Sequence, residues 1–309
     1  MREGRTTFTV PRDGRTSTTF YKIVGDLTNG TPPLIVLHGG PSAGHGYMAP
    51  FGHLWLTHGV PVVFYDQIGC GQSSHFPDTL GDETLWREST YVAELENLIA
   101  HLQLEHFHIL GHSFGCMWAL AYAATQPAGL RSLVLASPSV SAEAYVRSHD
   151  INRARLPEDV QRTINEAMRT QQFDTSEYCQ ARGAFIQKFL CGIEPMPAVM
   201  AEGVGNMQSD MTAQLTLGGN IEFGVGGSMK DYDYTPRLPL ISVPVLVWNS
   251  EFDIHHDVTV DPFFEHLPRV RMVKWPGSGH LVHLEGDGKG EKAVKLVGDF
   301  LKPEVNAKA

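Results

Sequence analysis

The chain lacks an excess of positive charge. Its 309 residues include 24 Lys and Arg against 34 Asp and Glu, which gives a formal net charge of −10. Nucleic acids and anionic membrane surfaces need a basic protein face to bind. We therefore expect neither a nucleic acid nor a membrane as a partner, whereas a cationic substrate is compatible with this charge.

Long apolar runs are absent as well. No stretch approaches the roughly 20 apolar residues of a membrane-spanning helix, and residues 1–7 carry no apolar signal core. These two absences lead us to expect a cytoplasmic protein.

Motifs for metals, nucleotides and disulfides are missing too. The sequence has no HExxH, no phosphate-binding GxGxxG and no GKS/T loop. The cysteines show no CxxC or metal-type spacing and are expected to be reduced thiols; they are Cys70, Cys116, Cys179 and Cys191. We accordingly predict a protein without a bound metal ion or other cofactor.

What the sequence does contain is an alternation of apolar strands and amphipathic helices. Strands are predicted at Leu34–Leu37, Val60–Tyr65 and Leu130–Ala136. A helix is predicted by apolar residues at helical spacing, namely Val92, Leu95, Leu98, Ile99 and Leu102. An opening hairpin is predicted from Phe8–Val10 and Thr18–Val24 around the turn residues Pro11–Gly14. This pattern predicts an α/β fold with a mostly parallel central sheet and helices on both faces.

The pattern of apolar residues changes between residues 139 and 236. Apolar strands disappear, and the methionines of this segment are Met168, Met196, Met200, Met207, Met211 and Met229. Methionine fills irregular apolar space, which suits a pocket roof as well as ordinary packing. Strand patterns resume at Val243–Asn249 and Val270–Trp275. We therefore predict a core of residues 1–138 and 237–309, with residues 139–236 inserted into it as a helical cap.

The segment Gly111-His112-Ser113-Phe114-Gly115 fits a nucleophile elbow, in which a strand turns sharply into a helix and presents a serine. An apolar strand candidate precedes it and helix-forming residues follow it. The tight turn requires positive φ at the serine and leaves no room for side chains at the flanking positions, which accounts for both glycines. We predict Ser113 as a nucleophile.

A serine hydroxyl becomes nucleophilic only when an oriented base accepts its proton. In elbow-type hydrolases the acid and the histidine follow later in the chain, each at the end of a strand. Asp253 follows the strand pattern at residues 245–249, and His280 follows a glycine-rich loop after residues 270–275, so we predict these two. The alternatives are Glu251 and Asp257 for the acid, and His255, His256 and His283 for the base.

Acyl transfer also requires hydrogen-bond donors for the developing oxyanion. One donor is expected from the backbone N–H of Phe114, directly after the nucleophile. The other is expected from the loop His38-Gly39-Gly40-Pro41, whose glycines let the backbone approach a substrate. Gly40 is the first choice and Gly39 is the alternative.

With these pieces assembled, the chain resembles the proline iminopeptidase family of α/β-hydrolases, serine peptidases that release an N-terminal amino acid. The matching segments are His38–Pro41, Asp66–Ser73, Gly111–Gly115, Gly219–Phe223, Glu251–Asp253 and Gly279–His280. The elbow alone is unspecific, but an HGGP loop together with a DQxGxGxS loop is a specific combination. The resemblance implies an α/β-hydrolase fold with a helical cap over Ser113, Asp253 and His280.

The resemblance also bears on the substrate. Family enzymes hold the free ammonium of the substrate with acidic residues, and Glu222 matches the cap glutamate of that pattern. The alternative for Glu222 is a solvated charge at a helix end. A second glutamate often follows the triad aspartate, where this chain has Ile254, and the usual HGGPG loop here ends in Ser42. The isoleucine is expected to weaken binding of a free amino terminus and to favour a neutral or bulkier group.

We therefore predict a serine hydrolase that cleaves an amide or peptide bond next to a free amino terminus through an acyl-enzyme. Its substrate would be a small molecule or a short peptide. Within the same machinery, the alternative is an esterase, lactonase or acyl-transferring enzyme that acts on a specialised small molecule. Epoxide hydrolases and dehalogenases place an aspartate at the elbow, so Ser113 argues against them.

Overall fold

The computed structural model describes residues 1–11, 14–220 and 222–302 of the chain. In this part of the chain, eight strands form one sheet in the order β1-β2-β4-β3-β5-β6-β7-β8. Their bounds are β1 (Arg2–Thr9), β2 (Thr16–Val24), β3 (Leu34–Leu37), β4 (Val62–Tyr65), β5 (Phe107–His112), β6 (Leu130–Ala136), β7 (Val245–Phe252) and β8 (Val270–Gly279). The pairs β1·β2 and β2·β4 are antiparallel, and all others are parallel. The predicted α/β fold with a mostly parallel sheet is confirmed.

The opening hairpin is present and longer than the sequence pattern indicates. Arg2 of β1 pairs with Ile23 of β2, and Thr9 pairs with Thr16 at the turn. Residues 12 and 13 of the predicted turn lie outside the described residues.

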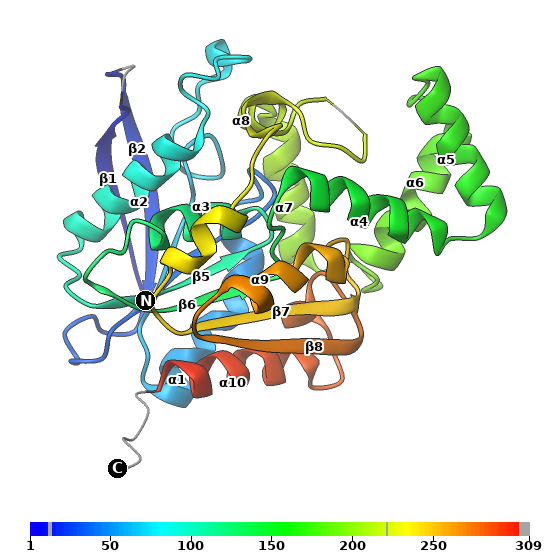
Figure 1. Ribbon diagram of the computed structural model, residues 1–309. Helices are drawn as coiled ribbons and strands as arrows, with labels where there is room; N and C mark the ends of the chain where they lie inside the picture. The colour runs from blue at the N-terminus through cyan, green and yellow to red at the C-terminus, as the bar shows by residue number, and fades with distance from the viewer. Residues whose placement is uncertain (12–13, 221, 303–309) are drawn as a thin grey trace.

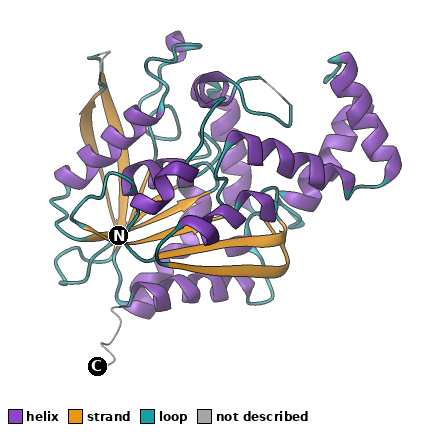
Figure 2. Ribbon diagram, in the orientation of Figure 1, coloured by secondary structure: helices purple, strands orange, loops and turns teal. Residues whose placement is uncertain are grey.

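Helices cover both faces of the sheet (Figure 2). Their bounds are α1 (Leu54–His58), α2 (Glu88–His101), α3 (Gly115–Ala123), α9 (Asp261–His266) and α10 (Lys289–Leu301). One apolar cluster joins the sheet to α2, α3 and α9, and a second joins it to α1 and α10. Figure 1 shows the same two layers, with α1 and α10 together on one side. Among the described residues, no helix combines the length and the apolar character that crossing a membrane requires.

Among the described residues, five α-helices lie between β6 and β7. They are α4 (Ala142–Ala154), α5 (Glu158–Thr170), α6 (Ser176–Phe189), α7 (Ala198–Ser209) and α8 (Thr212–Gly218). In Figure 1, α5 and α6 project away from the sheet, and they contain most of a small apolar cluster of their own, which is Leu156, Ile164, Ala181, Phe185 and Phe189. The segment is helical, as expected.

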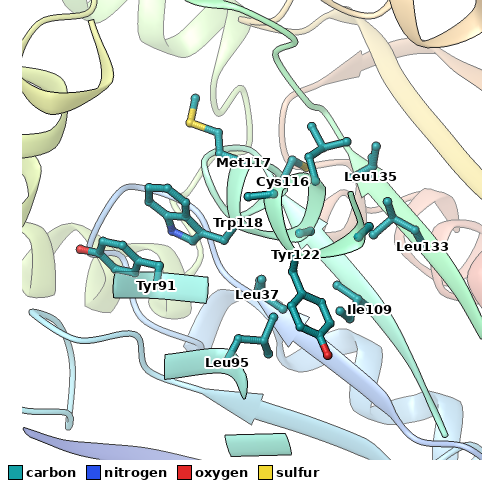
Figure 3. Close-up of a cluster of buried hydrophobic side chains, with 14 of the residues drawn as sticks. Leu37, Tyr91, Leu95, Ile109, Cys116, Met117, Trp118, Tyr122, Leu133 and Leu135 are labelled. Atoms are coloured by element: carbon teal, nitrogen blue, oxygen red, sulfur yellow. The ribbon is translucent and has the colours of Figure 1, made fainter. Parts of the chain in front are cut away.

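Helix α3, which follows the candidate nucleophile, is held on every side. All of its residues are buried, and Figure 3 shows the side chains of Cys116, Met117, Trp118 and Tyr122 among apolar side chains of the strands and α2. Trp118 stacks on Tyr91 with ring centroids 4.4 Å apart. Because α3 is tightly packed, the position of the turn that precedes it is fixed.

The carboxyl ends of β7 and β8 differ from the prediction. A glycine-rich loop was expected at residues 276–279, but these residues continue β8, and Gly279 pairs with Phe252 of β7. The loop prediction was wrong because β7 also extends further than its apolar run, and its backbone gives β8 a partner. The pairing has a direct consequence, since the residues that follow Phe252 and Gly279 are Asp253 and His280.

A buried carboxyl group links α2 to the loop after β4. Glu94 is fully buried and accepts hydrogen bonds from the Thr19 hydroxyl (2.6 Å) and from the backbone N–H of Ile68 (3.0 Å). Burial raises the pKa of this carboxyl from 4.5 to about 7. The folded chain therefore binds a proton at Glu94 between these two pH values, where the unfolded chain has lost it.

This shift predicts a pH-dependent loss of stability. As pH rises from about 4.5 to about 7, Glu94 must ionise while buried, so its contribution to the free energy of unfolding falls. Glu94→Gln cannot ionise. Between about pH 5 and about pH 8, we expect its free energy of unfolding to gain about 1 to 3 kcal/mol relative to the original chain. The exposed Glu96→Gln on the same helix is the control, and equal pH profiles for both variants would contradict the prediction.

Candidate active site

The turn between β5 and α3 has the geometry of a nucleophile elbow. Ser113 has a φ of 52° and is half-buried, and its N–H donates to the carbonyl oxygen of Ala136 (2.9 Å). A Cβ on Gly111 would lie 2.8 Å from the Cα of Cys116, and one on Gly115 would clash with the carbonyl oxygen of Leu37. The sharp turn predicted at Ser113 is confirmed, and so is the need for both glycines.

Asp253 and His280 are joined at the neighbouring ends of β7 and β8. The Nδ1–H of His280 donates to Oδ1 of Asp253 (2.6 Å), and both side chains are almost fully buried. The carboxylate also accepts hydrogen bonds from the Ser137 hydroxyl (2.6 Å) and from the backbone N–H of His255 (2.9 Å). Burial alone would raise the pKa of Asp253, but the charge and hydrogen bond of His280, the charge of His255 and the hydrogen bond of Ser137 outweigh it and lower the pKa. The hydrogen bond to the carboxylate is made by Nδ1 of His280, so Nε2 is the ring nitrogen that this contact does not use.

The alternative acids do not contact His280. Asp257 accepts hydrogen bonds from Lys274 and from the Asn249 amide (2.7 Å). Glu251 accepts one from the backbone N–H of Gly277 (2.7 Å). Both carboxylates are therefore bound to other donors, and Asp253 holds the position beside the imidazole.

The alternative bases have other environments. His255 donates from Nδ1 to the carbonyl oxygen of Ser137 (2.7 Å), and burial lowers its pKa to about 3. His256 uses its ring to accept a weak hydrogen bond from the Val258 N–H (3.5 Å). His283 is buried as well, and burial lowers its pKa to about 3. Among these histidines, His280 is the one whose Nδ1 is held by a carboxylate.

The elbow and the loop of His280 are joined through His112. The Nε2–H of His112 donates to the backbone carbonyl oxygen of His280 (3.1 Å), and the two rings lie 4.8 Å apart. Within the described residues, the Ser113 hydroxyl is not hydrogen-bonded to His280. Catalytic hydrogen bonds of this kind often tighten only when a substrate binds.

The glycine-rich loop after β3 contains the two alternative oxyanion donors, Gly39 and Gly40, and their N–H groups have different partners. The N–H of Gly39 donates to the Tyr47 hydroxyl (2.6 Å), so it is already used. The N–H groups of Gly40 and Phe114 donate to no other described residue. Gly40 has a φ of 125°, a conformation that essentially only glycine adopts. The geometry thus favours Gly40 over Gly39 as the partner of Phe114.

The DQxGxGxS segment is hydrogen-bonded to this loop. The Asp66 carboxylate accepts hydrogen bonds from the backbone N–H groups of His45 (2.8 Å) and Gln72 (2.8 Å). The Gln67 amide donates to the carbonyl oxygen of His38 (2.8 Å). This segment therefore shapes the loop that carries Gly40, and its side chains have a structural role.

Glu222 follows α8 and is paired with a cation of the chain itself. Its Oε2 accepts a hydrogen bond from Nε of Arg182 (3.4 Å), and its side chain is 28% exposed. Burial and then the nearby charge of Glu222 raise the pKa of Tyr145 to about 12. The ring of Tyr145 lies 5.7 Å from that of His255, next to Asp253. Glu222 is therefore near the candidate site, but it is neither fully buried nor unpaired.

Ile254 joins the apolar cluster of α5 and α6. It is partly buried and packs against this cluster. Its carbonyl oxygen accepts hydrogen bonds from the Ser148 hydroxyl and from the Asn152 amide (3.1 Å), both on α4. The position that often carries a second glutamate is thus an apolar contact in this chain.

Sequence reasoning missed Ser137, which comes directly after β6. Its φ is 53°, its hydroxyl donates to Asp253 and its carbonyl oxygen accepts from His255. Parallel strands end at the same edge of the sheet, so a polar residue after β6 was a signal that Ser137 lies near Ser113 and Asp253.

Three of these side chains are close enough to bind a metal ion. Possible ligand atoms of Asp253, His255 and His280 lie within 4.8 Å of one another. The Asp253 carboxylate, however, already accepts three hydrogen bonds, from His280, His255 and Ser137. A metal ion would have to displace them, so the donor set fits a hydrogen-bonded acid better than a metal ligand.

Comparisons with known proteins give consistent findings. The family described as alpha/beta hydrolase fold matches residues 32–287. A proline iminopeptidase of Levilactobacillus brevis is 34% identical over 270 residues, covering 86% of this chain and 88% of the relative. The crystal structure of a Mycobacterium smegmatis proline iminopeptidase has a TM-score of 0.87 and 32% identity, with 96% and 97% of the two chains covered. The crystal structure of VinJ has a TM-score of 0.87 and 34% identity, with 96% and 98% covered.

Proposed function

Because the chain belongs to the α/β-hydrolase fold family, and within it to the proline iminopeptidase family, we propose that it cleaves an amide or peptide bond next to a free amino terminus. Family membership makes the protein a hydrolase. The proposal adds the covalent mechanism and the substrate class. The observation that carries the mechanism is the hydrogen bond between His280 and Asp253, formed beside a serine held at positive φ.

In the proposed acylation, the oxygen of Ser113 attacks the substrate carbonyl while Nε2 of His280 takes the hydroxyl proton. The N–H groups of Gly40 and Phe114 stabilise the oxyanion. When the C–N bond breaks, His280 returns the proton to the leaving amine. A water molecule then hydrolyses the acyl-enzyme with His280 again as the base, and Asp253 holds the imidazole in the required tautomer throughout.

We also propose that residues 139–236 act as a cap over this site. Ser148 and Asn152 on α4 donate hydrogen bonds to the backbone of the segment that carries Asp253. Asn206 on α7 donates to the carbonyl oxygen of Ala43 (3.0 Å), in the loop of Gly40. The helical segment thus contacts the segments of both the acid and an oxyanion donor, which supports a roof over the substrate.

The curated relatives are named proline iminopeptidases, and this name suggests substrates with a free amino-terminal residue. In the proposal, Glu222 attracts the ammonium group. Two observations favour a second candidate, an esterase, lactonase or acyl-transferring enzyme for a specialised small molecule. Arg182 already neutralises part of the charge of Glu222, and Ile254 offers an apolar contact.

Matched substrates distinguish the two candidates. The experiment compares aminoacyl arylamides with N-acetylated aminoacyl arylamides and simple acyl esters, with Ser113→Ala as the blank. A peptidase is expected to turn over the free-amine arylamides fastest. If acetylation leaves turnover unchanged or raises it, the aminopeptidase proposal is wrong and the second candidate replaces it.

Glu222→Gln tests the proposed ammonium site. Removing the charge is expected to raise KM about 3- to 10-fold for free-amine arylamides, because the carboxylate is partly exposed and paired with Arg182. N-acetylated substrates and esters are expected to keep their KM. Glu166→Gln is the matched control, since Glu166 is also paired with an arginine, Arg169, but lies on α5. An equal KM change for neutral esters would remove Glu222 from substrate recognition.

A further inference from the structure

Two buried side chains connect three segments of the candidate site. Tyr47 lies in the 3₁₀ helix η1 (Gly46–His53), and His112 is the last residue of β5. Only 3% of Tyr47 and 2% of His112 are exposed. The Tyr47 hydroxyl bonds the N–H of Gly39 (2.6 Å) and Nδ1 of His112 (2.8 Å), and Nε2 of His112 bonds the carbonyl oxygen of His280 (3.1 Å).

The donors and acceptors in this chain of hydrogen bonds have one consistent direction. A carbonyl oxygen can only accept, so Nε2 of His112 carries the hydrogen that reaches His280. Burial lowers the pKa of His112 well below its usual value, so the ring is neutral and its Nδ1 accepts a proton donor. Tyr47 must then donate to Nδ1, and its oxygen accepts the N–H of Gly39. No member of the chain is left unpaired.

This series of hydrogen bonds begins and ends next to residues of the proposed reaction. Gly39 precedes the proposed oxyanion donor Gly40, and His112 precedes Ser113. The third contact is with the backbone of His280 itself. We propose that Tyr47 and His112 are positioning residues that fix the oxyanion loop, the nucleophile and the base relative to one another. This inference rests on the proposed function and deepens it.

The packing around the two side chains makes their hydrogen bonds hard to replace. The buried ring of His283 lies 5.1 Å from that of His112 and 5.7 Å from that of Tyr47, measured between ring centroids. A Cβ on Gly39 would lie 2.9 Å from the Cβ of Ser113 and 3.1 Å from the Tyr47 hydroxyl. With this tight packing, removal of the hydroxyl leaves Gly39 and His112 with buried unpaired groups and frees the two segments to shift.

Tyr47→Phe tests the proposal. The variant is expected to lower kcat for an arylamide or ester about 10- to 100-fold and to leave KM within about 2-fold, because positioning affects the transition state more than binding. The rate at which a serine-directed phosphonate modifies Ser113 is expected to fall by a similar factor. Both rates are expressed per titratable Ser113, so partial unfolding does not imitate the effect.

Tyr65→Phe is the matched control. Tyr65 is a fully buried tyrosine on β4, and its hydroxyl has no hydrogen-bond partner. The same chemical change there removes no hydrogen bond, so kcat, KM and the rate of phosphonate modification are expected to stay at their original values. The control separates the loss of this particular hydroxyl from the loss of any buried one.

A double-mutant cycle with His112→Leu asks whether the two side chains act as one unit. The double variant is expected to lose about as much kcat as the more damaged single variant, because each change breaks the same connection. Multiplied losses would show independent roles and overturn the proposal. If His112→Leu does not fold, Tyr47→Phe alone decides.

Unchanged kcat and unchanged phosphonate reactivity in Tyr47→Phe would also overturn the proposal while leaving the proposed function intact. Failure of the proposed substrate class would appear only in the comparison of free-amine and N-acetylated arylamides and would not change phosphonate reactivity. Failure of the proposed covalent mechanism gives a different result. In that case Ser113 of the unmodified chain would not react with the phosphonate at all.

Discussion

Ser113→Ala is expected to abolish hydrolysis while leaving the fold intact. The side chain is half-buried and its backbone is held by the Ala136 carbonyl oxygen, so removal of one oxygen atom disturbs little packing. Without the nucleophile, no acyl-enzyme forms, and we expect kcat/KM to fall about 10⁴-fold or more for every substrate. Initial rates with arylamides and esters measure the loss, and the melting temperature checks the fold.

Covalent labelling gives an independent measure of the same prediction. A serine-directed phosphonate is expected to add once to the unmodified chain, on the peptide that contains Ser113, and not to Ser113→Ala. Ser17→Ala is the matched control, because Ser17 is a buried serine on β2 whose hydroxyl has no partner. It should retain full activity and labelling. Residual activity of Ser113→Ala near the original value would rule out the covalent mechanism.

Asp253→Asn is expected to have the second largest effect. An amide in this position can donate from its NH₂ group to Nδ1 of His280. The ring hydrogen of His280 then lies on Nε2, so Nε2 can no longer accept the proton of Ser113. The amide also ceases to stabilise the imidazolium that forms when Ser113 loses its proton. We expect kcat/KM to fall about 10³- to 10⁴-fold, measured with the same arylamides and esters.

Asp257→Asn is the control for this prediction. Asp257 lies on the same segment after β7, is bonded to Asn249 and Lys274, and does not contact His280. It is expected to retain nearly full activity, because its carboxylate orients no catalytic group. If Asp257→Asn proved inactive while Asp253→Asn remained active, the assignment of the acid would have to be reversed.

The features that could be predicted from the sequence are those encoded by residues close together in the chain. The elbow is one of them, because its strand, its two glycines and its helix are contiguous, and their steric requirements act locally. The strands of the parallel sheet are another, because apolar runs of the right length are buried on both faces. Asp253 was ranked above its neighbours by its position after a strand, whereas His280 was ranked by a glycine-rich loop that the structure shows to be part of β8.

Other features depend on partners that are distant in sequence. The strand character of residues 276–279 arises from pairing with β7, although glycine and proline there favour a loop. The ion pair of Glu222 with Arg182 requires α6 and the segment after α8 to meet. The chain's own cation beside Glu222 could not be inferred from a glutamate in a family motif.

The sequence by itself determined the class of protein and predicted the chemistry that we propose for it. Short motifs carry this information, because a serine at a strained turn, with an acid and a histidine after later strands, suits few reactions other than acyl transfer. Only the tertiary structure decided which groups are free and which are engaged. Gly39 is bound by Tyr47 while Gly40 is not, and a hydrogen bond between residues far apart in the chain exists only where packing brings donor and acceptor within about 3 Å.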